Sequence, residues 1–321
     1  MAEAATSAPA LLIGGPTASG KSGLALSLAR EHEGVVINAD SMQVYRDLAI
    51  MTARPDAEEM EEAPHRLFGF LDAAQPCSVA FWLDAARRAA QEAVAAGHVP
   101  ILVGGTGLYL AAFVEGISPM PDVPPQARQE IACRMAERGS AALHQELAAL
   151  DPETAARLPP GDRQRIVRAL EVVIATGTPL SAWQKLPREG GWNGPVLQIN
   201  VDPDRQDLRS ACDSRFDAMM ACGALEEIAA LAARGLDPDL PAMRALGVPP
   251  LIEHLAGRMA LEEAVERAKA GTRQYAKRQA TWFRNQSRQA LRIEGFGHGP
   301  AAESALEAAA GFLLTACGPR A

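Results

Sequence analysis

The 321-residue sequence is poor in aromatic side chains, at 5% of residues, and its five cysteines form no CxxC pair. An odd number of scattered cysteines argues against a zinc site and against a disulfide framework, so we expect reduced thiols. No run reaches the roughly 18 consecutive apolar residues that a membrane helix needs, and residues 1–10 lack the pattern of a secretory signal. We therefore expect a cytoplasmic protein that makes no membrane contact.

The composition is otherwise that of a folded protein, with 48% hydrophobic and 22% charged residues. A chain of this length and composition has enough apolar surface for about two domains, which excludes disorder. The net charge of -8 argues against nucleic acid as a partner. Net charge is an average over the whole surface, however, and a local basic face can exist within an acidic protein.

Short apolar runs at residues 11–13, 35–37 and 100–103 each end in turn residues, and helical patterns cover residues 22–30 and 78–96. Such alternation predicts an α/β fold, with a parallel sheet flanked by helices and its chemistry at the carboxyl ends of the strands. Residues 116–194 carry helix start signals at Asp151-Pro152 and at Asp162 and a stop signal at Gly177, and they are predicted to form an all-helical insertion domain. Residues 1–115 and 195–321 would then form the catalytic core.

Within the second part of the core, residues 196–201 alternate like a strand that returns to the sheet. Residues 204–288 have helical character, with expected breaks at Gly235, at Pro238 and at Pro249-Pro250. The first ten residues and the last few are expected to be tails.

The segment GPTASGKS at residues 15–22 fits the GxxxxGK[ST] motif at every fixed position and lies between a predicted strand and a predicted helix. In such a loop the backbone N–H groups surround phosphate oxygens, Lys21 supplies a positive charge and the Ser22 hydroxyl ligates Mg²⁺. The motif makes the fold P-loop NTPase-like, but leaves open whether ATP or another diphosphate is bound. The predicted phosphate-binding residues are Gly15, Pro16, Thr17, Ala18, Ser19, Gly20, Lys21 and Ser22.

Two further residues follow predicted strands and should face the same crevice. Asp40 has three possible roles: a magnesium ligand, a general base, or an N-cap for the turn that begins at Ser41. Thr106, after Gly104-Gly105, is either a turn residue or a ligand contact.

Residues 267–292 contain eight basic residues and no Asp or Glu. Solvated surface helices usually mix both signs of charge, so we favour binding to a nucleic-acid phosphate backbone over an ordinary surface helix. Gln164, Arg165 and Arg168 in the insertion would extend this surface. At ~100° per residue, one helix stripe about 100° wide contains Lys269, Arg273, Lys277, Arg284 and Arg288. Among the interleaved Tyr275, Trp282 and Phe283, at least two are expected to pack in the core.

Several segments occur in an order that resembles the tRNA dimethylallyltransferase (tRNA isopentenyl-diphosphate transferase) family of bacterial type. Besides GPTASGKS, they are Asp40-Ser41 with Tyr45, TARP at 52–55, APHRL at 63–67, GGTGLY at 104–109 and KRQATWFR at 277–284. The resemblance extends over residues 11–291. It implies transfer of a dimethylallyl group from dimethylallyl diphosphate to N6 of the adenosine 3′ of the anticodon, with Mg²⁺, in tRNAs reading codons that begin with U.

The resemblance also implies roles for residues. Asp40 would be the proton acceptor, Thr17 and Thr106 would line the channel, and Arg128 would lie near substrate. The tRNA anticodon stem-loop would contact Asp40, Ser41, Met42, Gln43, Gln164, Arg165, Arg168, Arg244, Lys277, Arg278, Gln279, Thr281, Trp282 and Arg284. We expect the enzyme to be a monomer.

This sequence departs from the family pattern at two places. Met51 stands where a glycine is usual, with Arg54 replacing a lysine, and Val248-Pro249 stand where the family has tyrosine and a basic residue. Other hypotheses are an adenylate isopentenyltransferase acting on a free nucleotide, a P-loop kinase or nucleic-acid-stimulated ATPase, and a non-catalytic RNA-binding regulator. An adenylate isopentenyltransferase would have no use for the basic helix, and an RNA-binding regulator would leave the phosphate loop unexplained.

Overall fold

The computed structural model describes residues 8–317, which form two compact units. One unit comprises the described residues up to Val114 and from Trp192 onward, and the other is Glu115–Gly191. No helix of the described residues is long and apolar enough to cross a membrane.

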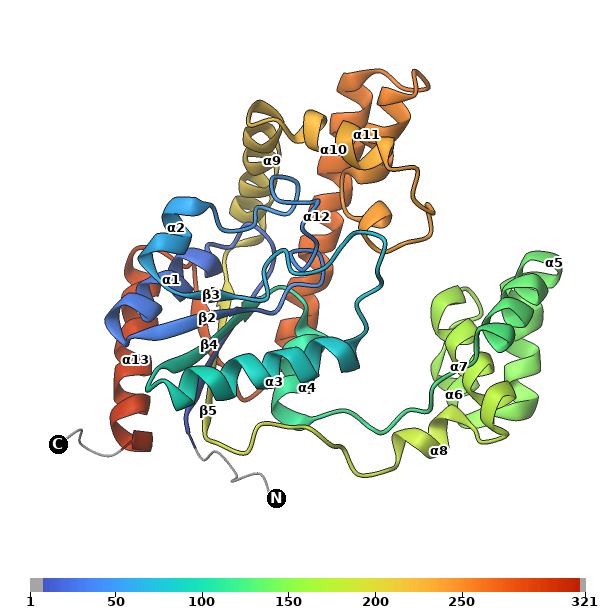
Figure 1. Ribbon diagram of the computed structural model, residues 1–321, viewed down its shortest axis with the longest axis horizontal. Coiled ribbons are helices and arrows are strands. Elements are labelled where there is room, and N and C mark those ends of the chain that lie inside the picture. The colour runs from blue at the N-terminus through green and yellow to red at the C-terminus, as the bar shows by residue number, and fades with distance from the viewer. Residues whose placement is uncertain (1–7, 318–321) are drawn as a thin grey trace. The chain divides into compact units, whose positions relative to one another are not determined.

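A six-stranded parallel sheet forms the centre of the larger unit, in the order β3-β2-β4-β1-β5-β6 (Figure 1). The three strands β1, β2 and β4 are buried along their whole length, which explains why they read as continuous apolar runs. The predicted α/β fold is thereby confirmed. The strands are β1 (Ala10–Gly14), β2 (Gly34–Asn38), β3 (His65–Arg66), β4 (Val99–Gly104), β5 (Val196–Asp202) and β6 (Leu291–Glu294).

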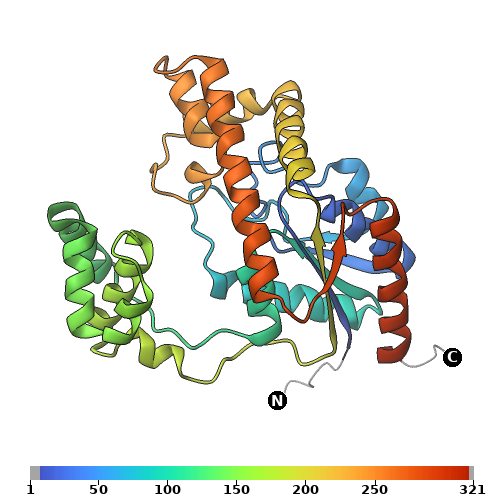
Figure 2. The same cartoon turned by 180° about the vertical axis from the view of Figure 1, so that it is seen from behind.

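Helices cover both faces of this sheet (Figures 1 and 2). On one face, α1 (Lys21–Glu31) and α13 (Pro300–Cys317) share an apolar core with the strands. On the other, α3 (Val79–Ala95) places the Trp82 indole N–H on the Asn38 carbonyl at 2.9 Å. The remaining helices of this unit are α2 (Ala57–Glu62), α4 (Gly107–Glu115), α9 (Arg205–Ala221), α10 (Ala224–Ala233), the short 3₁₀ helix η1 (Ala242–Arg244), α11 (Val248–Leu255) and α12 (Leu261–Gln286).

Helix α12 packs closely on the carboxyl ends of the central strands because glycines stand there. A Cβ atom on Gly14 would lie 2.4 Å from Cε1 of Phe283, and one on Gly107 would lie 2.1 Å from the Trp282 ring. These distances are too short for any side chain, so the glycines around the phosphate loop and the GGTG segment serve helix packing as well as turn formation.

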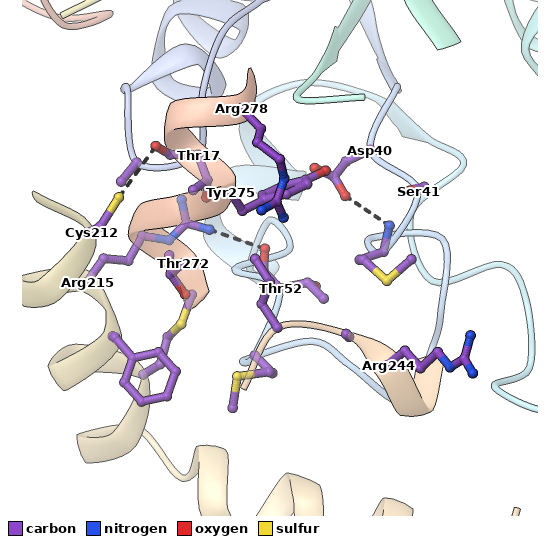
Figure 3. Close-up of a pocket in the computed structure, with 17 residues that line it drawn as sticks. Thr17, Asp40, Ser41, Thr52, Cys212, Arg215, Arg244, Thr272, Tyr275 and Arg278 are labelled. Carbon is purple, nitrogen blue, oxygen red and sulfur yellow. Dashed lines mark hydrogen bonds between the residues drawn. The ribbon is translucent and has the colours of Figure 1, made fainter. Parts of the chain in front are cut away.

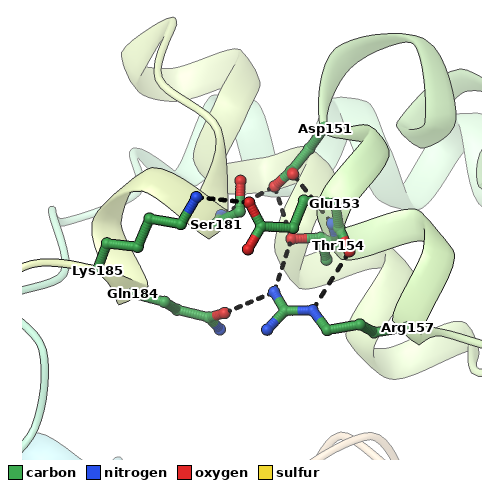
Figure 4. Close-up of polar contacts among 7 residues, drawn as sticks. All are labelled: Asp151, Glu153, Thr154, Arg157, Ser181, Gln184 and Lys185. Carbon is green, nitrogen blue, oxygen red and sulfur yellow. Dashed lines mark hydrogen bonds and ion pairs between the residues drawn. The ribbon is translucent and has the colours of Figure 1, made fainter.

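The smaller unit consists of α5 (Pro125–Leu150), α6 (Pro152–Arg157), α7 (Arg163–Thr176) and α8 (Leu180–Gln184). Buried Asp151 joins three of these helices, because its carboxylate accepts the Thr154 N–H at 3.1 Å, the Thr154 hydroxyl at 2.7 Å and the Ser181 N–H at 2.9 Å (Figure 4). Burial by itself raises the pKa of Asp151, but these bonds outweigh it and hold the pKa below its usual value. The predicted caps at Asp151, Asp162 and Gly177 are confirmed.

Two expectations about element ends are wrong, and two elements are missing from the prediction. Pro249 and Pro250 do not interrupt the helical region but begin α11, where a missing N–H removes no helical hydrogen bond. Ala10, expected in a tail, is the first residue of β1. Strand β6 and helix α13 follow the basic segment, where we predicted no element. Residues 1–7 and 318–321 of the expected tails lie outside the described residues.

Candidate active site

The phosphate loop connects β1 to α1 at the carboxyl edge of the sheet. Gly20 precedes α1 with φ of +82°, a conformation that strains any residue with a Cβ atom. The Ser19 hydroxyl is buried without a hydrogen-bond partner among the described residues, and Ser22 is exposed. A helix N-terminus attracts anions, and these hydroxyls add donors beside it.

Lys21 is almost fully buried, and its ammonium donates to the Pro16 carbonyl at 3.1 Å. Burial is the main reason why the pKa of Lys21 falls from 10.5 to about 8. The negative charge of Asp40 opposes this change and the positive charge of Arg215 adds to it, so the three ionisable groups act on one another electrostatically. An anion bound beside Lys21 would favour its charged form.

Asp40 follows β2 and faces the same crevice as the phosphate loop. Its Oδ1 accepts the Met42 N–H at 2.9 Å, and its own N–H donates to Asn38 Oδ1 at 2.8 Å. Thr106 fixes the next residue, because its hydroxyl accepts the Ser41 N–H at 3.0 Å. The second carboxylate oxygen of Asp40 makes no hydrogen bond within the described part of the chain. That oxygen is therefore available to a ligand or a proton.

Arg215 of α9 is a site residue that the sequence did not reveal, since an isolated arginine in a helical segment carries no motif. It is half-buried, and desolvation lowers its pKa while Asp40 opposes the change. Its Nη2 donates to the Thr52 carbonyl at 3.3 Å, whereas its Nε is buried without a partner among residues 8–317. A guanidinium with a free, buried donor is suited to bind an anion.

These groups surround two neighbouring cavities. The smaller one brings Thr17, Lys21 and Ser22 of the phosphate loop together with Asp40 and Arg215. The larger one has a volume of about 330 Å³ and is shown in Figure 3. Thr17, Asp40 and Arg215 line both, so the phosphate site adjoins a larger chamber. Its apolar wall consists of Met42, Met51, Phe216, Met219, Ala245 and Leu246, and its polar wall includes Arg244, Thr272, Tyr275 and Arg278.

Gln279, which the sequence analysis expects to contact tRNA, is buried. Its side chain is 5% exposed, its Oε1 accepts the Thr17 N–H at 2.8 Å, and its Nε2 donates to the Gly105 carbonyl at 2.8 Å. Both ends of the carboxamide are thus used by the backbone of two loops. Gln279 therefore joins α12 to the phosphate loop.

The basic segment is less uniformly charged in the structure than its sequence predicts, because acids from other elements neutralise part of it. Lys269 pairs with Asp217 at 2.7 Å, Arg273 pairs with Asp213 at 2.5 Å, and Arg284 binds both carboxylate oxygens of Asp202. The expected helical stripe also ends early, since α12 stops at Gln286 and Arg288 lies beyond it. Along α12, Lys277 and Arg278 are exposed and form no ion pair within the described residues.

The other predicted contact residues fall into two groups. Arg244 is exposed and paired with Asp239, Thr281 is exposed, and Trp282 is half-buried on α12. Of the three interleaved aromatic residues, Phe283 is buried, whereas Tyr275 and Trp282 are half-buried. The remaining four, Arg128, Gln164, Arg165 and Arg168, belong to the helical unit, where Arg165 pairs with Asp162 and Arg168 with Glu171.

Both departures from the family pattern are accommodated locally. Met51 has a negative φ, so this position needs no glycine. The Met51 side chain packs against Gly247, where an added Cβ atom would lie 2.8 Å from the Met51 sulfur. Arg54 donates to the carbonyls of Tyr45 and Arg46 at 3.4 Å. Val248 is fully buried at the start of α11, so an aromatic contact to substrate is absent from this position.

A phosphate loop, a carboxylate and a half-buried arginine lie at the edge of a parallel sheet beside a partly apolar chamber, and together they define a P-loop protein. Its site suits a phosphorylated ligand that also carries an apolar group.

Comparison with known proteins narrows this class. The protein-family profile described as IPP transferase matches residues 43–286, and that described as Isopentenyl transferase matches residues 9–72. The chain therefore belongs to the IPP transferase family.

The sequence is 55% identical to the tRNA dimethylallyltransferase of Methylobacterium nodulans, over 86% of this chain and 92% of that protein. It is 54% identical to the protein of the same name from Rhodospirillum rubrum, over 88% and 87% of the two chains. Among solved structures, the tRNA isopentenylpyrophosphate transferase of Bacillus halodurans is 33% identical with a TM-score of 0.70, covering 97% of this chain and 98% of that one. A eukaryotic dimethylallyltransferase acting on tRNA is 26% identical with a TM-score of 0.82, covering 96% and 80%.

Proposed function

We propose that this protein is a tRNA dimethylallyltransferase. It transfers the dimethylallyl group of dimethylallyl diphosphate to N6 of the adenosine 3′ of the anticodon, in tRNAs that read codons beginning with U. The observation that carries the proposal is the shared lining of the two cavities. Thr17, Asp40 and Arg215 connect a phosphate site to a partly apolar chamber, in a chain that belongs to the IPP transferase family.

In this reaction the adenine N6 forms a bond to C1 of the allyl group while the C1–O bond breaks. The bonding electrons leave with the diphosphate. Lys21, Arg215 and the N-terminus of α1 stabilise the charge that develops on the departing oxygen. The free oxygen of Asp40 takes the proton that N6 loses, a contribution of about 10²–10⁴ in rate. Thr17 and Thr106 border the reacting groups.

Mg²⁺ is part of the proposal because the donor set fits a hard cation. The Ser22 hydroxyl, an oxygen ligand, lines the small cavity beside the phosphate loop. The described residues contain no cluster of three or more His, Cys, Asp or Glu side chains that would hold a metal alone. Bound together with diphosphate, the ion would neutralise charge on the phosphate oxygens.

Contacts to tRNA are assigned to the exposed cations Lys277 and Arg278 and to the chamber residues Ser41, Met42 and Arg244. Because a loop base is stacked in free tRNA, it must turn out of the stack to enter the chamber, at a cost of a few kcal/mol. Arg128 and the basic residues of α7 are proposed as further contacts. We also propose that the enzyme is a monomer.

The test is incubation of the protein with labelled dimethylallyl diphosphate, Mg²⁺ and unmodified tRNA. Label should appear on the adenosine 3′ of the anticodon, and its absence with folded protein would remove the proposal. AMP serves as the competing acceptor: labelling of AMP in preference to tRNA would identify an adenylate isopentenyltransferase. Rapid hydrolysis of ATP without prenyl transfer would favour a kinase or ATPase.

A further inference from the structure

The turn at residues 49–51 is held from outside the chamber by one carboxylate. Glu227 of α10 accepts the backbone N–H groups of Ala49 at 2.7 Å, Ile50 at 2.8 Å and Met51 at 2.9 Å. Its Oε2 takes the first two and its Oε1 the third. Hydrogen bonds to an ionised carboxylate are roughly twice as strong as neutral ones, so this turn has a firm anchor.

The anchored turn leads directly into the wall of the site. Met51 and Thr52 line the chamber, whereas Glu227 lines neither cavity. The Thr52 carbonyl accepts Arg215 Nη2 at 3.3 Å and Gln43 Nε2 at 3.0 Å. Because the Arg215 Nε has no partner among the described residues, the Thr52 carbonyl is the one hydrogen-bond acceptor that the structure shows for this guanidinium.

Helix α10 braces the same loop at a second point. Arg234, directly after the helix, pairs with Asp47 and also with Asp72 at 2.7 Å. The residues that Arg234 contacts are farther from Thr52 in the sequence than residues 49–51, whose N–H groups Glu227 accepts. Of the two, only Glu227 holds the residues immediately before Thr52.

We propose that Glu227 is a positioning residue for the diphosphate donor. It fixes residues 49–51, so that the Thr52 carbonyl holds the Arg215 guanidinium toward the phosphate loop. The inference rests on the proposed function for the identity of the donor. The anion-binding part of it is testable without the transfer reaction.

The test compares Glu227→Gln with Glu226→Gln. Glu226 is the adjacent α10 residue, is exposed and makes no hydrogen bond or ion pair within the described chain. In Glu227→Gln, the amide –NH₂ must face a backbone N–H, which displaces the turn. We expect the Kd for inorganic pyrophosphate and the KM for dimethylallyl diphosphate to rise about tenfold, and kcat to fall as well because Arg215 also stabilises the departing oxygen, with the Kd for tRNA changing less than about twofold. Glu226→Gln should match the unmodified protein.

A double-mutant cycle distinguishes positioning from general stability. In an Arg215→Lys background, Glu227→Gln should change pyrophosphate affinity by less than about twofold, because the group through which it acts is already altered. Equal losses in both backgrounds would overturn the proposal. So would an unchanged Kd in Glu227→Gln when thermal melting alone is affected. Failure of the unmodified protein to label tRNA, with pyrophosphate binding intact, would remove the transfer function and leave the Glu227 inference standing.

Discussion

The Gln279 carboxamide accepts the Thr17 N–H at 2.8 Å, a bond between residues 262 positions apart in the chain. Thr17 belongs to the phosphate loop, and Gln279 lies on α12 between the exposed Lys277 and Arg278 on one side and the exposed Thr281 on the other. One helix thus presents cations to solvent while its buried face holds the diphosphate loop. The same helical turns therefore hold the phosphate loop and carry Lys277 and Arg278, which we propose contact tRNA.

Removing this link should loosen the phosphate loop. Gln279→Ala leaves the Thr17 N–H and the Gly105 carbonyl without their partner, and we expect a loss of about 1–3 kcal/mol in the free energy of unfolding for each group that stays dry. Urea unfolding measures the change. Gln274→Ala, at an exposed position of the same helix, is the matched control. Equal unfolding midpoints for the two variants would contradict the bridging role.

Asp40→Asn should separate catalysis from binding. The Asn Oδ1 can still accept the Met42 N–H, so the local turn is kept, but the amide cannot take a proton from N6. We expect the single-turnover rate of prenyl transfer to fall by about 10²–10⁴, while tRNA affinity in a filter-binding assay changes far less. Equal losses of rate and affinity would make Asp40 an anchor for tRNA and not a base.

The salt dependence of tRNA binding should distinguish free from paired cations. Lys277 forms no ion pair among residues 8–317, whereas Arg267, on the same helix, pairs with Glu263 at 2.7 Å. Lys277→Ala should lower the slope of log affinity against log salt by about 0.7–0.9, the value for one phosphate contact. Arg267→Ala should leave the slope nearly unchanged, and a similar drop for both variants would count against this assignment.

The stability of the helical unit should depend on pH through Asp151. Its pKa is lower folded than unfolded, so its contribution is fully present above pH 3.8 and is lost as pH falls through the folded value. Asp151→Asn should therefore reduce hydrogen-exchange protection of α6 and α8 at pH 7 by about 1–3 kcal/mol, with a smaller difference from the unmodified protein at pH 3. Glu153→Gln, which removes only an exposed ion pair with Lys185, should have little effect. A pH-independent difference for Asp151→Asn would refute this reading.

The sequence by itself determined the features that depend on neighbouring residues. The buried strands, the phosphate loop at residues 15–22, the helix caps at Asp151 and Asp162, and the family all follow from local patterns. The contribution of β6 and α13 to the fold does not follow from local patterns. Strand β6 is short, and it pairs with β5, so that Leu291 lies opposite Ile199, a residue far from it in the sequence.

Only the tertiary structure decided which polar groups meet. Arg215 and Glu227 belong to no motif. Their roles arise because α9 and α10 pack beside a loop that lies much earlier in the chain: Arg215 is 163 positions from Thr52, and Glu227 is 176 positions from Met51. The basic segment contains no acid of its own, yet Asp202, Asp213 and Asp217 reach it from β5 and α9. Electrostatic energy depends on distance in space, and folding brings these charges together irrespective of their order in the chain.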